Sequence, residues 1–162
     1  MSSESARASS AAEARFRIDD ANSRQRTVQV VALDGLSEAV VRRLAAGKWG
    51  GARFLTAAAP AADMRVAIGE LGDVGRRADP LTAGEGADLV ALVATAGEDF
   101  AACVVGEACR RGATTIAFVL TGPSTAHEAL SRTLARLRPW TLMLTIAEDA
   151  DCIADALRAL RA

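Results

Sequence analysis

The chain has few of the residues that usually carry catalysis or metal binding. Among its 162 residues are one histidine, three cysteines and no tyrosine. The single histidine, His127, has no second histidine four residues away, so the zinc-protease motif is absent. Cys103, Cys109 and Cys152 form no CxxC pair, and three thiols cannot all pair with one another. We therefore assign no catalytic or metal-binding residue and expect reduced, mostly buried thiols.

A strong charge of one sign and long apolar runs are also missing. The formal net charge is -1, which gives no bulk electrostatic reason to bind nucleic acid or an anionic membrane. The longest apolar runs have the length of strands, so no membrane span is expected. The N-terminus lacks the apolar region of a secretory signal. These absences favour a cytoplasmic protein.

Hydrophobic residues, in contrast, make up 51% of the chain, which is enough to bury one full core. Residues 1–26 are rich in Ala, Ser, Arg and Glu without apolar periodicity and are predicted to be a disordered arm. Residues 27–162 are predicted to form a single α/β domain.

The segment from Ala87 to Gly122 organises this domain. Its first part, 88–95, is an apolar run too short for a helix and is predicted to be a buried strand of a parallel sheet. Glu98 and Asp99 then suit the first turn of a helix that stops at Gly112, because acidic side chains complement the helix dipole there. A second strand over 114–121 completes a right-handed βαβ unit.

The same alternation extends to both sides of this unit. Further strands are predicted over 27–33, 52–57, 65–69 and 140–146, and further helices over about 36–47, 124–137 and 147–162. The connection 70–86 is long and glycine-rich. The pattern predicts a three-layer Rossmann-like sandwich with a mainly parallel sheet of about six strands. The first helix should bury an apolar stripe formed by Leu36, Val40, Val41 and Leu44. Trp49, which follows this helix, should be exposed.

Ligands of such folds bind beyond the carboxyl ends of the strands. The candidate ligand-binding residues follow those ends: Asp34, Gly35, Thr56, Thr95, Ala96, Gly97, Glu98, Asp99, Thr121 and Gly122. Three of them, Asp34, Glu98 and Asp99, could form a carboxylate cluster for magnesium or acid–base work. A turn residue and two helix-start acids explain the same positions. Ser124 and Thr125 are expected to be ordinary helix N-caps.

From Val28 to about Leu157 the chain resembles the nucleotide-binding domain of FtsZ, the bacterial homologue of tubulin. VQVVALDGLSEAVVRRL lies where that family has its first strand, glycine-rich loop and first helix, and GARFLTAA where it has the second strand. GADLVALVATAGEDFAACVVGEACRRGATTIAFVLTGP resembles the core strand, phosphate loop, following helix and next strand. RPWTLMLTIAEDA resembles the sixth strand and its loop. The resemblance implies a GTPase-domain-like fold and, as cofactor, GTP or GDP with magnesium.

The sequence departs from that family at the residues that hold phosphate. The family's loop reads G-G-G-T-G-T-G, whereas this chain has Ala94 to Phe100 with one glycine, Gly97. Glu98 and Asp99 place negative charge where a triphosphate would lie. We also find no counterpart of the second tubulin-like domain, so GTP hydrolysis driven by self-assembly is not expected.

Three interpretations therefore stay open. The leading one is a degenerate FtsZ/tubulin-like domain, not an active GTPase, that acts as a binding or assembly module with a protein partner or as a homo-oligomer. The second is a phosphate-binding protein or enzyme of the SIS or general Rossmann type, in which Thr121, Ser124 and Thr125 supply hydroxyls. The third is an accessory subunit that acts through a protein interface.

Overall fold

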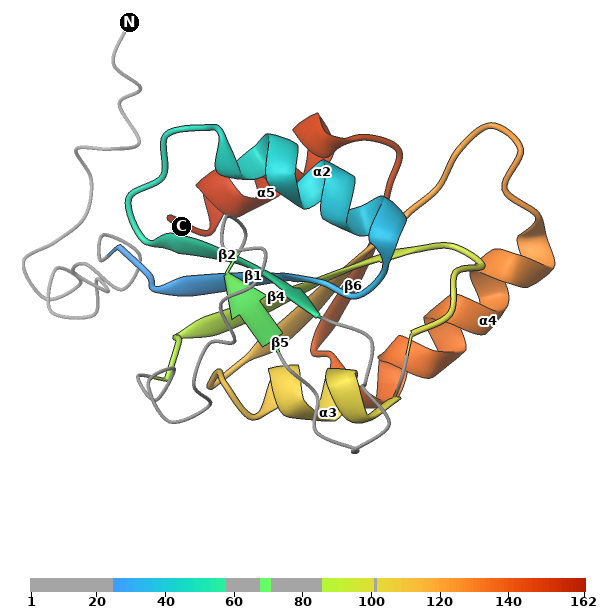
Figure 1. Cartoon of the computed structure of the whole chain (residues 1–162), viewed down its shortest axis with the longest axis horizontal. Helices are drawn as coiled ribbons and strands as arrows, with labels where there is room; N and C mark the ends of the chain where they lie inside the picture. The colour runs from blue at the N-terminus through green and yellow to red at the C-terminus, as the bar shows by residue number, and fades with distance from the viewer. Residues whose placement is uncertain (1–24, 58–67, 71–85, 101) are drawn as a thin grey trace, which may run out of the picture.

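Six strands form one sheet in the order β3-β2-β1-β4-β5-β6. The computed structural model describes residues 25–57, 68–70, 86–100 and 102–162 (Figure 1). The strand β3 runs antiparallel to β2, and all other neighbouring strands are parallel. The mainly parallel α/β sheet predicted from the sequence is therefore confirmed. The strands are β1 (Val28–Ala32), β2 (Ala52–Ala57), β3 (Ile68–Glu70), β4 (Leu89–Thr95), β5 (Thr115–Leu120) and β6 (Met143–Ala147).

Helices cover both faces of this sheet and make the expected three layers. On one face lie α2 (Gly35–Ala45) and α5 (Ala150–Ala159), and on the other α3 (Ala102–Cys109) and α4 (His127–Leu137) (Figure 1). A short 3-10 helix, η2 (Arg138–Trp140), follows α4. Each face of the sheet thus has its own hydrophobic core.

The strands β1, β4 and β5 are buried along almost their whole length, as their continuous apolar sequence predicts. Alternate residues point to opposite layers. Phe118 of β5, for example, packs in the core under α2 and α5, whereas its neighbour Val119 packs in the core under α3 and α4. In α5, Ile153 and Leu157 are fully buried and Leu160 packs partly buried against the same core.

Two helices begin later than the sequence predicts. The helix after β4 begins at Ala102, so Glu98 and Asp99 lie in a loop instead of a first helical turn. The helix after β5 begins at His127, and its N-cap residue Ala126 has no side-chain cap. The prediction that Ser124 or Thr125 caps this helix is wrong. In both places the chain after the strand forms a turn whose hydrogen bonds are described below.

The prediction for the first helix is wrong at two positions. Leu36 is 58% exposed, because the buried face of α2 runs through Ser37, Val41 and Leu44 and Leu36 lies outside it. Trp49 is half-buried against the core under α2 and α5. Its indole Nε1 donates a 2.7 Å hydrogen bond to the Leu44 carbonyl, and its ring centroid lies 5.7 Å from that of Phe54. Trp49 is therefore a packing residue and not an exposed partner surface.

Several predictions concern segments outside the described residues. Most of the predicted arm 1–26 and of the connection 70–86 lies there, as does the first part of the strand predicted over 65–69. In the part of the chain that the structure does describe, no helix is long and apolar enough to cross a bilayer.

Candidate functional site

The predicted ligand-binding residues lie at the carboxyl ends of four neighbouring strands. Thr56 lies in β2 next to its last residue, Asp34 follows β1, Thr95 ends β4 and Thr121 follows β5. These strands are adjacent in the sheet and parallel, so their ends form a single rim. The question is whether polar groups of this rim are available to a ligand.

The Asp34 carboxylate is the most heavily bonded group of the rim. Its Oδ1 accepts hydrogen bonds from the Ser37 amide at 2.8 Å and from the Thr95 hydroxyl at 2.9 Å, and its Oδ2 accepts from the Thr95 amide at 2.7 Å. The first bond caps α2, and the Ser37 hydroxyl returns the contact by accepting from the Asp34 amide at 3.1 Å. Asp34 thus ties the start of α2 to the end of β4.

Glu38, one turn further along α2, joins Thr56 to the same helix. Its Oε2 accepts a 2.9 Å hydrogen bond from the Thr56 hydroxyl, and its Oε1 lies 2.6 Å from Nη2 of Arg42. The hydrogen bond from Arg42 lowers the pKa of Glu38, burial opposes this, and the bond from Thr56 lowers it further. Glu38 was absent from the predicted site, although its spacing of four residues from Arg42 is a recognisable ion-pair pattern.

The loop after β4 has no free amide among its three central residues. The Ala96 amide donates to the Leu120 carbonyl at 2.9 Å, and the Glu98 amide donates to the Thr95 carbonyl at 3.1 Å. Between them, the Gly97 amide donates to the hydroxyl of Thr133 in α4 at 3.0 Å. Gly97 has φ of 90°, a conformation that favours glycine, and an added Cβ would lie 3.1 Å from Cβ of Ala129.

The carboxylate cluster that the sequence left open as an alternative is not formed. Asp99 Oδ1 lies 3.0 Å from Nη1 of Arg136 in α4. The same guanidinium lies 4.4 Å from the centroid of the Phe100 ring and donates to the Phe100 carbonyl. Among the described residues, no three His, Cys, Asp or Glu side chains are placed to hold a metal ion. The Asp34 carboxylate instead accepts hydrogen bonds from Ser37 and Thr95.

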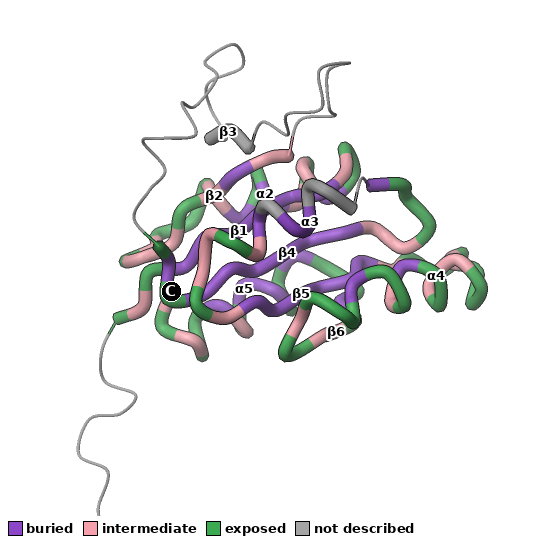
Figure 2. Tube along the Cα trace, turned by 90° about the horizontal axis from the view of Figure 1, so that it is seen from below, coloured by how far each residue is buried: buried purple, intermediate pink, exposed green. Residues whose placement is uncertain are grey.

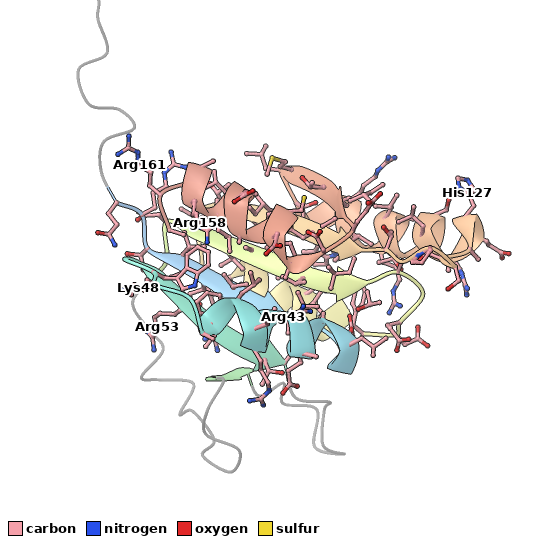
Figure 3. All side chains as sticks on the ribbon, turned by 90° about the horizontal axis from the view of Figure 1, so that it is seen from above. Arg43, Lys48, Arg53, His127, Arg158 and Arg161 are labelled. Carbon is pink, nitrogen blue, oxygen red and sulfur yellow. The ribbon has the colours of Figure 1, made fainter. Side chains whose placement is uncertain are left out.

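The loop after β5 is also closed by its own hydrogen bonds. The Thr121 amide donates to the Ala147 carbonyl at 2.9 Å, and the Gly122 amide donates to the Thr125 hydroxyl at 2.7 Å. The Thr125 amide in turn donates to the Gly122 carbonyl at 3.0 Å. His127 is exposed at the first turn of α4, and Figure 3 shows it at the far tip of that helix.

The described cysteines differ in environment. Cys109 of α3 is partly buried, and its thiol lies 3.8 Å from the Trp140 carbonyl oxygen. Burial raises the pKa of Cys109. Cys152 of α5 is exposed, so the prediction of mostly buried thiols is wrong at that position.

A second surface, which the sequence did not indicate, lies along the outer edge of β6. Among the described residues no strand pairs with this edge, and Figure 2 shows exposed and intermediate residues along β6 where β4 and β5 are buried. Four large apolar side chains are exposed in or beside this strand. We call them the apolar edge: Trp140 (46% exposed), Leu142 (83%), Met143 (41%) and Ile146 (48%).

The apolar edge was missed because WTLMLTI has the composition of a buried strand, and only the strand order places it at an edge. The charge pattern points the same wrong way. From Pro139 to Ala147 the chain has no charged residue, whereas edge strands commonly carry charges that prevent pairing.

The chain matches no protein-family model, and a search of curated proteins finds no match.

Proposed function

We propose that this chain is a binding or assembly module that does not hydrolyse a nucleotide and that acts through a protein interface. The observation that carries the proposal is the hydrogen bonding of the loop after β4. A phosphate site at such a loop needs backbone N–H groups that point at the anion. Here the amides of Ala96, Gly97 and Glu98 all donate to acceptors within the chain.

The charges of the rim support the same proposal. Glu98 and Asp99 are exposed beside this loop, and like charges at close range oppose the binding of a polyphosphate. The Asp34 carboxylate accepts three hydrogen bonds within the domain. In this proposal the rim keeps the architecture that resembles the FtsZ domain, and its polar groups stabilise the fold.

The apolar edge gives the module a surface through which to act. Soluble proteins rarely expose a contiguous apolar patch without a partner for it. Leu142 is 83% exposed and its neighbour Met143 is 41% exposed, in a stretch without charges. A protein interface accounts for these side chains, whereas a small-ligand site at the rim does not.

A thermal-shift screen of the full chain tests the proposal. We expect no stabilisation by GTP, GDP, ATP, NAD or sugar phosphates, with or without magnesium. A ligand present at one hundred times its Kd would add about 2.7 kcal/mol of stability, which corresponds to a rise in Tm of about 5 to 10 °C for a domain of this size.

Two results would overturn this proposal in different directions. A rise in Tm with a guanine nucleotide, abolished in the variant Gly97→Asp, would establish a working FtsZ-like cleft. A rise with sugar phosphates alone would favour the SIS-type interpretation.

A further inference from the structure

We propose that the partner of the apolar edge is a second copy of this chain, joined by antiparallel pairing of β6 with β6 across a two-fold axis. The inference rests on the proposed function and names its partner and its surface. Pairing at this edge extends the sheet from one copy into the next. Three features of the edge favour a second copy over an unrelated protein.

The first feature is the direction in which the apolar side chains point. In the parallel register of β5 and β6, Leu144 pairs with Ala117 and Ile146 pairs with Val119. Ala117 and Val119 belong to the core under α3 and α4, so Leu144 and Ile146 point to that same face. Leu142 lies in the bend directly before β6, where its amide donates to the Thr115 carbonyl at 2.8 Å. One face of β6 thus carries two aliphatic side chains, of which Ile146 is exposed, and the exposed Leu142 directly precedes the strand.

The second feature is that this row is complementary to itself. In an antiparallel pair centred on Leu144, each Leu142 lies opposite Ile146 of the second copy, and the two Leu144 side chains face one another. Directly opposed side chains of antiparallel strands lie on the same face and in contact. Centring the pair on Thr145 would pair Leu144 with Ile146 of the second copy, but it would place Leu142 opposite Glu148. The pattern therefore selects the register centred on Leu144.

The third feature is the charge at the two ends of the strand. Arg138 precedes β6 and Glu148 follows it, and both side chains are exposed. Neither forms an ion pair with another described residue. Because the two strands run in opposite directions, the end of β6 that follows η2 and its Arg138 lies beside the end of the other copy's β6 that Glu148 follows. The charges thus favour the antiparallel pair, and the uncharged stretch between them contains nothing that opposes it.

The contact between the copies is small, because one five-residue strand and the apolar edge form it. Interfaces of this kind lie at the low end of the size range, below about 1,200 Å². We therefore expect reversible dimers with a Kd of about 1 to 100 μM.

Sedimentation velocity of the full chain, from about 1 μM to about 500 μM, tests the inference. We expect a monomer–dimer equilibrium for the wild type and a dimer at least about tenfold weaker for Leu142→Lys. The matched control is Leu36→Lys, because Leu36 is also an exposed leucine but lies at the start of α2. This control should dimerise like the wild type. Circular dichroism checks that each variant is folded.

Two further sets of variants test the antiparallel direction of the pair and its register. Arg138→Glu should weaken the dimer severalfold, and the double change Arg138→Glu with Glu148→Arg should restore it. In a Cys152→Ser background, Leu144→Cys should form a disulfide-linked dimer under mild oxidation, because the register places residue 144 opposite itself. Leu36→Cys should not form one in the same background.

A monomer at every concentration overturns the inference. So does a dimer that Leu36→Lys weakens as much as Leu142→Lys, or one in which Leu144→Cys does not cross-link. These outcomes are independent of the ligand screen, which tests the proposed function. A protein that stays monomeric and also ignores small ligands would retain the proposed function and lose the second copy as partner.

Discussion

Removal of the Asp34 carboxylate should destabilise this domain more than the loss of an ordinary helix cap. In Asp34→Ala the cap of α2 is lost, which costs about 1 kcal/mol. The variant also loses the two hydrogen bonds from the amide and the hydroxyl of Thr95. Bonds to a charged acceptor contribute more than neutral ones, but this carboxylate is only partly buried, so we take about 1 kcal/mol for each. The expected loss of unfolding free energy is about 3 kcal/mol.

Asp149→Ala is a matched control for this experiment. Asp149 caps α5 through a 2.8 Å hydrogen bond from the Cys152 amide to its Oδ1. Its replacement should cost about 1 kcal/mol. The difference between the two variants measures the link from Asp34 to Thr95. Asp34→Asn should fall between wild type and Asp34→Ala, since an amide oxygen can keep the cap while its NH₂ group faces the Thr95 amide.

Equilibrium denaturation in urea, followed by circular dichroism, measures these free energies. A loss in Asp34→Ala no greater than that in Asp149→Ala would refute the reasoning, because it would show that the bonds to Thr95 contribute nothing. It would also weaken the view that the rim is occupied by structural bonds, since the Asp34 carboxylate would then be free to bind a ligand at little cost.

Three further predictions follow from other contacts. Gly97→Ala should lower the free energy of unfolding by about 1 to 3 kcal/mol, because Gly97 has a positive φ and an added Cβ would lie close to Ala129. Gly35→Ala is the control, since its Cβ would meet nothing within 4 Å, and it should change that free energy by less than about 0.5 kcal/mol. Urea denaturation compares the two variants. The pKa of Glu38 lies below its ordinary value of 4.5 in the folded state, so its contribution to stability is full above that value and is lost as the pH falls through the lowered pKa. The stability difference between wild type and Glu38→Gln should therefore be full at about pH 7 and shrink as the pH falls below 4.5, and denaturation at several pH values would contradict this if the difference stayed constant in acid. Iodoacetamide should modify exposed Cys152 faster than Cys109, whose raised pKa and partial burial reduce its thiolate fraction, and peptide mass spectrometry would reveal the reverse order if the assignment were wrong.

The helices and strands could be predicted largely from local pattern. The run over β4 is apolar at nearly every position and short, which is typical of a strand covered on both faces, and the structure buries it as predicted. The stripe of Ile153 and Leu157 likewise marks the inner face of α5. These signals are local, because a buried face repeats every two residues in a strand and about every 3.6 residues in a helix.

The start of α3 was predicted wrongly because it depends on contacts between distant residues. Acidic residues after a strand are typical of a helix start, yet Glu98 and Asp99 lie in a loop that is bonded to α4 through Thr133 and Arg136. Those partners are more than thirty residues away along the chain. No local pattern contains that information.

The candidate rim was only half predictable, for a related reason. Its position follows from strand–helix alternation, since the carboxyl ends of parallel strands share one edge. The state of its polar groups does not follow, because the same Asp34 could hold a ligand or hold Thr95. Tertiary structure decided between them by placing the Thr95 amide and hydroxyl 2.7 and 2.9 Å from its carboxylate oxygens.

The amino-acid sequence by itself determined that this chain builds strands and helices in alternation, and hence an α/β sandwich with a rim at its strand ends. Only the tertiary structure decided which strand lies at an edge. The hydrophobicity of a segment shows that its side chains favour burial, but the strand order determines whether neighbouring elements cover them. The strand β5 lies between β4 and β6 and is buried. The strand β6 has only β5 beside it among the described strands, and Leu142 and Ile146 stay exposed.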